Sequence, residues 1–320
     1  MDTIAKMNNR SENFVQKYKG ELILLLITFF WSATFVIVKE SLADISSMLF
    51  VGFRFLIAGL ILLPIVIRKK IKWEGVNLKL PITLGLLLFL GFASQTIGLR
   101  FTSATKSAFL TGSAVIIIPI LQTIIEKRKP KNGAIIGVVI VLMGILLLSG
   151  GNSFYTLLED LVANFNFGDG MTLLCALFFA LYVVYLDVLS NQYNFWLLLM
   201  IQIVVTTLLA FSFAIIFDIT DFESIKIEFS PQLGFGIMYT ALFATLATTA
   251  LQTRYQKLVT PTKAGIVYSF EPIMAAVIAF LAIGEKITIF GFIGAALIFI
   301  GLIISETFDG FVINRKSTTQ

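Results

Sequence analysis

Long apolar blocks alternate with short polar segments along nearly the whole chain. A helix of about 20 apolar residues is long enough to cross the hydrocarbon core of a bilayer. The pattern predicts ten such helices, near residues 20–40, 47–67, 80–99, 103–126, 132–150, 169–189, 194–217, 232–255, 262–283 and 287–306. We therefore expect an all-α membrane protein with ten transmembrane helices.

The composition supports this expectation and excludes several kinds of site. Hydrophobic residues make up 58% of the 320 residues and charged residues 13%, whereas a soluble domain is about 25% charged. The chain has no His, and Cys175 is its one cysteine. Histidine metal sites, His-based triads, thiolate clusters and intrachain disulfides are therefore excluded, and we expect no cofactor. Nucleic-acid binding is not expected either, because no basic run interleaved with aromatics lies on a soluble segment.

The positions of Lys and Arg predict the orientation in the membrane. With the N-terminus in the cytoplasm, 18 of the 24 Lys and Arg residues fall in cytoplasmic tails and loops, and 5 fall on the opposite side. This asymmetry predicts that both termini are cytoplasmic. The polar residues 1–19 precede an apolar segment without a convincing small-residue cleavage site, so we interpret that segment as a retained first helix.

The two halves of the chain share a pattern of polar and glycine positions. A shift of 157 residues places Gln95 on Gln252, Thr96 on Thr253, Lys106 on Lys263, Gly137 on Gly294 and Gly144 on Gly301. A shift of 148 residues aligns the first two spans of each half, with Gly20 on Gly168 and Arg54 on Gln202. Because five spans per half is an odd number, the halves must have opposite orientations. Such an inverted repeat is typical of secondary transporters.

Two short motifs, one in each half, resemble a known family. Residues 102–112 (TSATKSAFLTG), followed by Pro119, resemble the fourth helix of EamA-domain proteins in the drug/metabolite transporter superfamily. Residues 260–264 (TPTKA) with 270–272 (FEP) and 284–285 (GE) resemble the ninth helix and its exit. Residues 30–32 (FWS) with Lys39, and Arg54, fit the first two helices. The resemblance covers about residues 20–306.

The resemblance implies a transporter of small organic metabolites, such as amino acids or related compounds, in a bacterial cytoplasmic (inner) membrane. We expect a cytoplasmic tail at residues 1–19, EamA-like repeats at 20–150 and 169–306, an extracytoplasmic connection at 151–168 and a second cytoplasmic tail at 307–320. We interpret the chain as an exporter working by alternating access. The family is broad, so the resemblance identifies neither the metabolite nor the oligomeric state.

Glu271 and Arg54 are charged residues inside predicted spans, where charge is costly and is usually turned toward a cavity or a partner. Glu271 lies about ten residues into its span and precedes Pro272, which removes a backbone donor. We interpret both residues as candidates for coupling or gating. Glu271 is either a site for a substrate amine or a proton, or a structural carboxylate that caps loosened backbone or pairs with Arg54. Arg54 either holds a substrate carboxylate, tethers helices or extends to the interface.

Other polar and aromatic residues inside the spans are candidates for the wall of a substrate cavity. The repeated glutamines are expected to face the bundle interior, where they either bond between helices or line the cavity. Rings with a polar group suit a pocket and also suit ordinary packing. The candidates are Trp31, Thr34, Gln95, Thr111, Tyr182, Tyr185, Gln252 and Tyr268. The resemblance implies that spans one, three, four, six, eight and nine surround this cavity.

The glycines of the fifth and tenth spans predict a packing role. Gly133, Gly137 and Gly144 follow one side of the fifth span, and Gly294 and Gly301 repeat the pattern on the tenth. Small residues let helices approach closely in a membrane.

Alternatives to a secondary transporter are a channel-like facilitator and an intramembrane enzyme. No Walker motif indicates ATP-driven transport. Proton coupling through Glu271 is one form that a secondary mechanism would take.

Overall fold

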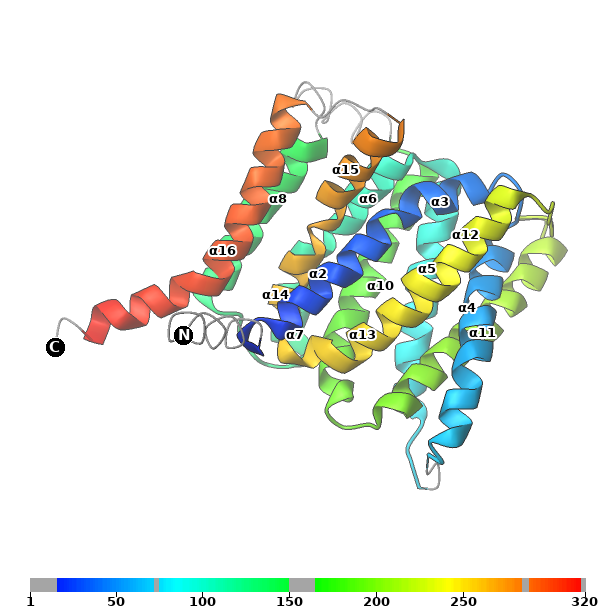
Figure 1. The fold of residues 1–320 in the computed structure, drawn as a ribbon, viewed down its shortest axis with the longest axis horizontal. Coiled ribbons are helices and arrows are strands. Elements are labelled where there is room, and N and C mark those ends of the chain that lie inside the picture. Colours follow the sequence, from blue (N-terminus) through cyan, green and yellow to red (C-terminus); the bar gives the residue numbers. More distant parts are fainter. Residues whose placement is uncertain (1–15, 72–74, 150–164, 284–287, 318–320) are drawn as a thin grey trace, which may run out of the picture.

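The computed structural model describes residues 16–71, 75–149, 165–283 and 288–317, and nearly all of them are helical (Figure 1). The α-helices are α2 (Lys19–Ser32), α3 (Thr34–Ser41), α4 (Ser47–Arg68), α5 (Lys79–Phe101), α6 (Ala104–Gly112), α7 (Ala114–Ile125), α8 (Asn132–Ser149), α10 (Phe167–Ser190), α11 (Phe195–Ile219), α12 (Pro231–Ala241), α13 (Thr248–Tyr255), α14 (Pro261–Tyr268), α15 (Glu271–Ile283) and α16 (Ile289–Ser317). A π-helical turn, η1 (Leu242–Ala247), joins α12 to α13, and a 3₁₀ turn, η2 (Gln256–Leu258), follows α13. The predicted all-helical class is confirmed for these residues.

Eight helices, some of them formed by consecutive elements, are long and apolar enough to cross a membrane. They are Lys19–Ser41, Ser47–Arg68, Lys79–Phe101, Ala104–Ile125, Phe167–Ser190, Phe195–Ile219, Pro231–Leu258 and Ile289–Phe308. Each of them coincides with a predicted span. Helix α8 covers the fifth predicted range, 132–150, but its apolar part, Asn132–Leu148, is shorter than these eight. Helices α14 and α15 together cover the ninth predicted range, 262–283. Exposed Ile, Leu and Phe side chains cover much of the outside, as expected of a surface in contact with lipid.

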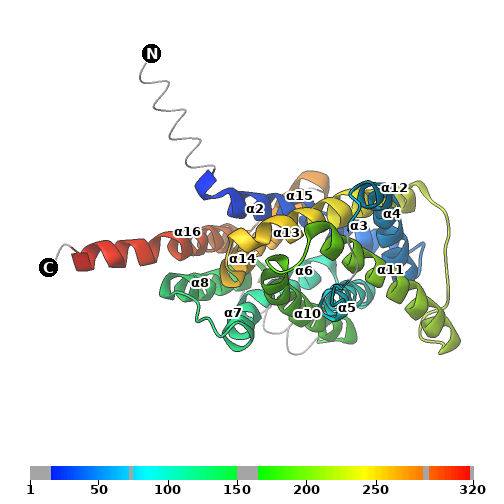
Figure 2. The same ribbon diagram turned by 90° about the horizontal axis from the view of Figure 1, so that it is seen from below.

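The helices form an elongated bundle. Helices α8 and α16 pack side by side along one edge of the bundle, and α4 and α11 form the opposite edge (Figures 1 and 2). Helix α5 is the most enclosed of the eight, since 72% of the residues in its apolar 18-residue stretch are buried. It packs along α10 in the middle of the bundle. Helices from the first half of the chain therefore pack mainly against helices from the second half.

The structure extends the last helix beyond the predicted span. The hydrophobic run ends near residue 306, but α16 continues to Ser317, because no proline interrupts the polar residues that follow. Most of the predicted connection at 151–168 and most of the predicted tail at 1–19 lie outside the described residues.

Three predicted continuous spans are interrupted in the middle. The interruptions fall at Ala33 between α2 and α3, at Ser113 between α6 and α7, and at residues 269–270 between α14 and α15. A serine hydroxyl at or beside each interruption donates to a carbonyl of the preceding turn: Ser32 to Phe29 O (2.8 Å), Ser113 to Leu110 O (2.6 Å) and Ser269 to Gly265 O (2.9 Å). Such bonds compete with the helical pattern and bend helices.

Helices α8 and α16 meet backbone to backbone at four glycines. A Cβ atom built on Gly137 would lie 2.7 Å from Gly301 O, and one on Gly301 would lie 2.9 Å from Gly137 O. A Cβ on Gly144 would lie 2.7 Å from Gly294 O, and one on Gly294 would lie 2.5 Å from Gly144 O. No side chain fits at these distances, so the predicted packing role of the glycines follows from the geometry.

We expect Gly294→Ala and Gly144→Ala each to lower the yield of folded protein, because the new methyl group would force α8 and α16 apart. Overpacking of this kind costs about 1–3 kcal/mol. The measurement is the monodisperse fraction and the thermal midpoint of the detergent-purified protein.

Gly234→Ala is the matched control, because a Cβ at Gly234 in α12 meets nothing within 4 Å. Alanine is the better helix former, so this variant should keep or raise the midpoint. Equal midpoints for the Gly294, Gly144 and Gly234 variants would refute the close-packing account.

Candidate functional site

A central cavity lies where the interrupted helices meet. Its volume in this structure is about 70 Å³, and its wall combines apolar and aromatic side chains with a few polar groups, as in small-molecule sites. Residues from α2, α3, α5, α6, α7, α10, α13, α14 and α15 line it. These elements belong to predicted spans one, three, four, six, eight and nine, the set that the family resemblance implies. All three interruptions border the cavity, as in transporters that bind substrate at discontinuous helices.

The cavity brings together most of the residues that the sequence singles out. Eight of the ten candidates line it: Trp31, Thr34, Gln95, Thr111, Tyr182, Gln252, Tyr268 and Glu271. Tyr185 is partly buried against the main hydrophobic core, and Arg54 lies outside the cavity. Phe92 and Phe179 complete the aromatic wall. The sequence does not single out these two, because nothing distinguishes them from the other 29 phenylalanines of the chain. Substrate binding by the lining residues stays a prediction.

Glu271 is the one charged residue among the described residues that line the cavity. It is the first residue of α15, and its side chain is 9% exposed. The N-terminus of a helix favours a carboxylate, so the interruption after Tyr268 helps to hold Glu271 in place. None of the ion pairs found in the described part of the chain includes Glu271. The cavity therefore presents a carboxylate without a cationic side chain beside it.

A polar network holds the aromatic residues of one wall. The indole Nε1 of Trp31 lies 3.3 Å from Ala244 O and 3.2 Å from Thr248 Oγ1. Its ring lies 5.4 Å from the Tyr268 ring. Gln252 Nε2 donates to the Tyr268 hydroxyl (3.0 Å), so one of the two repeated glutamines bonds between helices and also lines the cavity.

Gln256 extends this network to the first helix of the second half. The Tyr268 hydroxyl and Gln252 Nε2 both donate to Gln256 Oε1, at 3.2 and 2.9 Å. Gln256 Nε2 donates to Val183 O in α10 (2.7 Å). The network thereby connects α13, η2, α14 and α10. Gln256 is not among the predicted residues, because it lies just beyond the predicted end of its span at residue 255.

Tyr182 is held from the side opposite the cavity. Its hydroxyl donates to Gln202 Oε1 (2.6 Å), and Gln202 Nε2 donates to Leu198 O (3.0 Å). Gln202 is fully buried. The 148-residue shift in the sequence places Gln202 on Arg54, and both side chains support the cavity wall from behind.

Arg54 is buried behind the wall, with 1% of its surface exposed. Its Nε donates to Thr245 Oγ1 (2.8 Å) and its second terminal nitrogen donates to Ala244 O (3.1 Å). The guanidinium carbon lies 4.6 Å from the centroid of the Phe92 ring. Arg54 therefore ties α4 to the π-helical turn η1, and it neither extends to the interface nor pairs with Glu271. Of the alternatives raised by the sequence, this geometry favours helix tethering.

A second carboxylate lies away from the cavity, just beyond the end of α7. Burial, followed by the nearby Asp187 carboxylate, raises the pKa of Glu126 to about 7, while Arg128 partly offsets the rise. Both Glu126 oxygens are enclosed. The neutral acid is therefore appreciably populated near pH 7.

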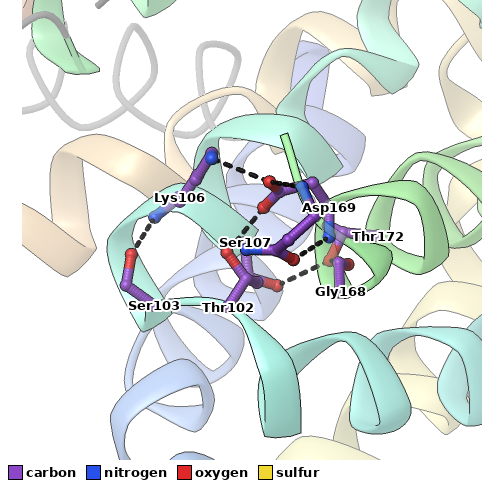
Figure 3. Close-up of polar contacts among 8 residues, drawn as sticks. Thr102, Ser103, Lys106, Ser107, Gly168, Asp169 and Thr172 are labelled. Atoms are coloured by element: carbon purple, nitrogen blue, oxygen red, sulfur yellow. Dashed lines mark hydrogen bonds and ion pairs between the residues drawn. The ribbon is translucent and has the colours of Figure 1, made fainter. Parts of the chain in front are cut away.

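A cluster of polar residues closes the bundle at the start of α10 (Figure 3). Asp169 is fully buried and lies 2.7 Å from Lys106 Nζ, and it accepts a hydrogen bond from the Thr102 hydroxyl (2.6 Å). The Asn166 amide N–H donates to Asp169 (2.9 Å), which completes a capping box at the start of the helix. The cluster joins the turn between α5 and α6 to the first helix of the second half.

Lys39 stabilises the same end of the bundle. Its ammonium group donates to Leu99 O (2.6 Å) and Thr102 O (2.9 Å). These carbonyls belong to the end of α5, where a cation is favourable.

Comparisons with known proteins agree with this architecture. The family model described as "EamA-like transporter family" matches residues 18–150 and 166–307. An uncharacterized transporter of Archaeoglobus fulgidus is 29% identical over 290 residues, covering 91% of this chain and 86% of the relative. The uncharacterized transporter YoaV of Bacillus subtilis is 26% identical over 298 residues, covering 90% and 96%. A solved crystal structure has the same fold, with a TM-score of 0.73 and 14% identity over 90% of this chain and 96% of that chain. The predicted resemblance is confirmed: this multi-pass membrane protein belongs to the EamA-like transporter family.

Proposed function

We propose that the protein is a secondary active transporter that exports small organic metabolites, such as amino acids or related compounds, by alternating access. The central cavity carries this proposal, because it is enclosed by helices of both halves and its described wall presents one carboxylate together with aromatic side chains. In the proposed architecture, ten helices form two inverted five-helix repeats. The protein lies in a bacterial cytoplasmic membrane with both termini in the cytoplasm.

Equivalent contacts in the two halves support the inverted repeat. A Cβ built on Gly168 would lie 2.8 Å from Phe101 Cβ and 2.8 Å from Thr102 N. A Cβ built on Gly20 would lie 3.0 Å from Leu258 Cβ and 2.5 Å from Val259 Cγ2. The 148-residue shift relates the two glycines, and the 157-residue shift relates their partners. The Gly137–Gly301 contact likewise maps onto the Gly294–Gly144 contact, as expected when a twofold axis relates two halves.

The charge distribution supports the orientation. The turns at Lys127–Lys131 and after α4 lie at the same end of the bundle as the start of α2 (Figure 1). We name this end, which contains Glu21 and Lys263, the inner end. The opposite end, which contains Asp169 and Lys106, is the outer end.

Glu271 is the proposed coupling residue. A buried carboxylate without a protein cation is costly, and either a proton or the amine of a substrate would remove that cost. Aromatic rings line the same cavity, and their faces attract a cation. Binding at Glu271 would in this way link substrate or proton occupancy to the access state of the cavity.

Counterflow in proteoliposomes tests the transport function. Vesicles are loaded with one of a panel of unlabelled amines and amino acids, and the same labelled compound is added outside. A carrier is expected to give a transient overshoot for at least one compound. A channel would give monotonic equilibration, and empty liposomes would give neither. Monotonic entry or no entry across a broad panel would refute the carrier.

Glu271→Gln should lower the initial counterflow rate by about tenfold at equal protein level, the effect of losing one charge-assisted contact. Gln keeps the size of the side chain, so the thermal midpoint should change little. Glu40→Gln is the matched control at an exposed carboxylate in α3, and it should transport at the wild-type rate. Wild-type transport by Glu271→Gln would make Glu271 structural.

The proposed orientation predicts opposite labelling of two exposed positions, Ser224 and Lys129. In a Cys175→Ser background, an impermeant maleimide added to intact cells should label Ser224→Cys and should label Lys129→Cys only after lysis. The reverse pattern would invert the topology.

A further inference from the structure

The two ends of the bundle carry equivalent charged pairs, but only the outer pair is formed. The repeat shifts place Asp169 on Glu21 and Lys106 on Lys263. At the outer end, Lys106 Nζ lies 2.7 Å from Asp169 Oδ2. At the inner end, Lys263 Nζ lies 2.7 Å from Oε2 of Glu306 in α16, and none of the ion pairs in the described part of the chain includes Glu21. Glu21 nevertheless lies within electrostatic reach of both Lys263 and Glu306.

Backbone packing brings Glu21 to the right place for the missing pair. Gly20 contacts Leu258 and Val259 just as Gly168 contacts Phe101 and Thr102. Glu21 therefore begins its helix beside the turn that leads to Lys263, as Asp169 begins its helix beside the turn that leads to Lys106. The equivalence lies in the contacts as well as in the sequence shift.

Glu306 is an acceptor that the outer end does not have. The residue at its place in the first half, 157 positions earlier, is Ser149. Only one Glu306 oxygen is bound in the structure, and Oε1 is buried without a hydrogen-bond partner. An enclosed oxygen left unpaired is costly, so Lys263 alone leaves Glu306 incompletely satisfied. Both side chains keep some exposure, 22% for Lys263 and 15% for Glu306, so water can replace the partner of each when the pair separates.

The surroundings of the two acidic residues also differ. Asp169 is fixed by Thr102 as well as by Lys106. At the inner end Val259 stands in the place of Thr102, and valine has no hydroxyl to donate. Glu21 therefore depends more on Lys263 for a partner than Asp169 depends on Lys106.

We propose that Lys263 exchanges between Glu306 and Glu21, and that the Lys263–Glu21 pair closes the inner end of the cavity in the opposite access state. The present structure, with Lys106 on Asp169 and Lys263 on Glu306, is then the state closed at the outer end. Glu306 is a holding site that keeps Lys263 away from Glu21 in this state. The proposal rests on the inverted repeat and alternating access proposed above.

A cysteine in the cavity wall reports which end is open. Ala114 lines the cavity at the start of α7, and Ala114→Cys in a Cys175→Ser background provides one reactive thiol. Its initial labelling rate is measured with an impermeant thiol reagent in inside-out vesicles, for inner access, and in right-side-out vesicles, for outer access.

The two carboxylates should have opposite effects. Glu306→Gln frees Lys263 for Glu21, so inner labelling should fall and outer labelling should rise, each by on the order of fivefold. Glu21→Gln removes the closing partner, so outer labelling should fall by a similar factor. Adding Lys263→Gln to either variant should abolish the difference between them. Glu40→Gln should leave both rates unchanged, and the thermal midpoint confirms that each variant is folded.

Shifts in the same direction for Glu306→Gln and Glu21→Gln would overturn the exchange. So would an effect of Glu306→Gln that persists in the Lys263→Gln background. These outcomes differ from a failure of the transport proposal, which would appear as labelling from one side only in every variant and as absent counterflow in the wild type.

Discussion

The structure depends on one constraint: a polar atom inside a membrane bundle has no water to bind, so its partner must come from the protein. Many buried Ser and Thr hydroxyls meet this requirement within their own helix, as Thr28 does with Leu24 O. Several of the longer polar side chains meet it across the two halves of the chain. Arg54 in α4 bonds to Thr245 in η1, and Gln122 in α7 accepts from the amide and hydroxyl of Thr262 at the start of α14 (3.0 and 2.6 Å). Asp169 in α10 is held by residues of the first half. The halves are therefore locked together by bonds that each half needs.

Glu271 gives the cavity its chemical character. Every other described residue on the wall is apolar or a neutral polar group, and several of the polar groups are already bonded within the protein. The one carboxylate lies at a helix N-terminus beside aromatic rings and without a cationic side chain. A site of this kind favours a positively charged group or a proton over an anion. The interruptions of α2–α3, α6–α7 and α14–α15 place it in the interior, where access from either end is controlled by the helices around it.

Much of this architecture follows from the sequence, because hydrophobic length, glycine spacing and repeat shifts are properties of the chain alone. The helix ranges, the packing of Gly137 and Gly294, and eight of the ten candidate residues on the cavity wall could be predicted in this way. The interruptions at Ala33 and Ser113 could not, since a serine that bonds to its own helix has the same sequence pattern as one that bonds elsewhere. The position of Arg54 behind the wall also needed the structure: its partners are the Thr245 hydroxyl and the Ala244 carbonyl in a π-helical turn, and nothing in the sequence marks that turn. The holding site at Glu306 was missed because it lies at the end of its span, where a charge is unremarkable.

The central claim is that the two ends of the bundle open in turn around one cavity. Pulsed electron paramagnetic resonance in lipid nanodiscs tests it most directly. One spin-label pair is placed at the outer end, at Thr105 and Phe165, and one at the inner end, at Lys17 and Lys257. All four residues are exposed. The account predicts that adding the substrate identified by counterflow changes the two distance distributions in opposite senses, so that one end narrows as the other widens. Widening at both ends together, as in a channel, would contradict it. So would distances that stay unchanged at both ends.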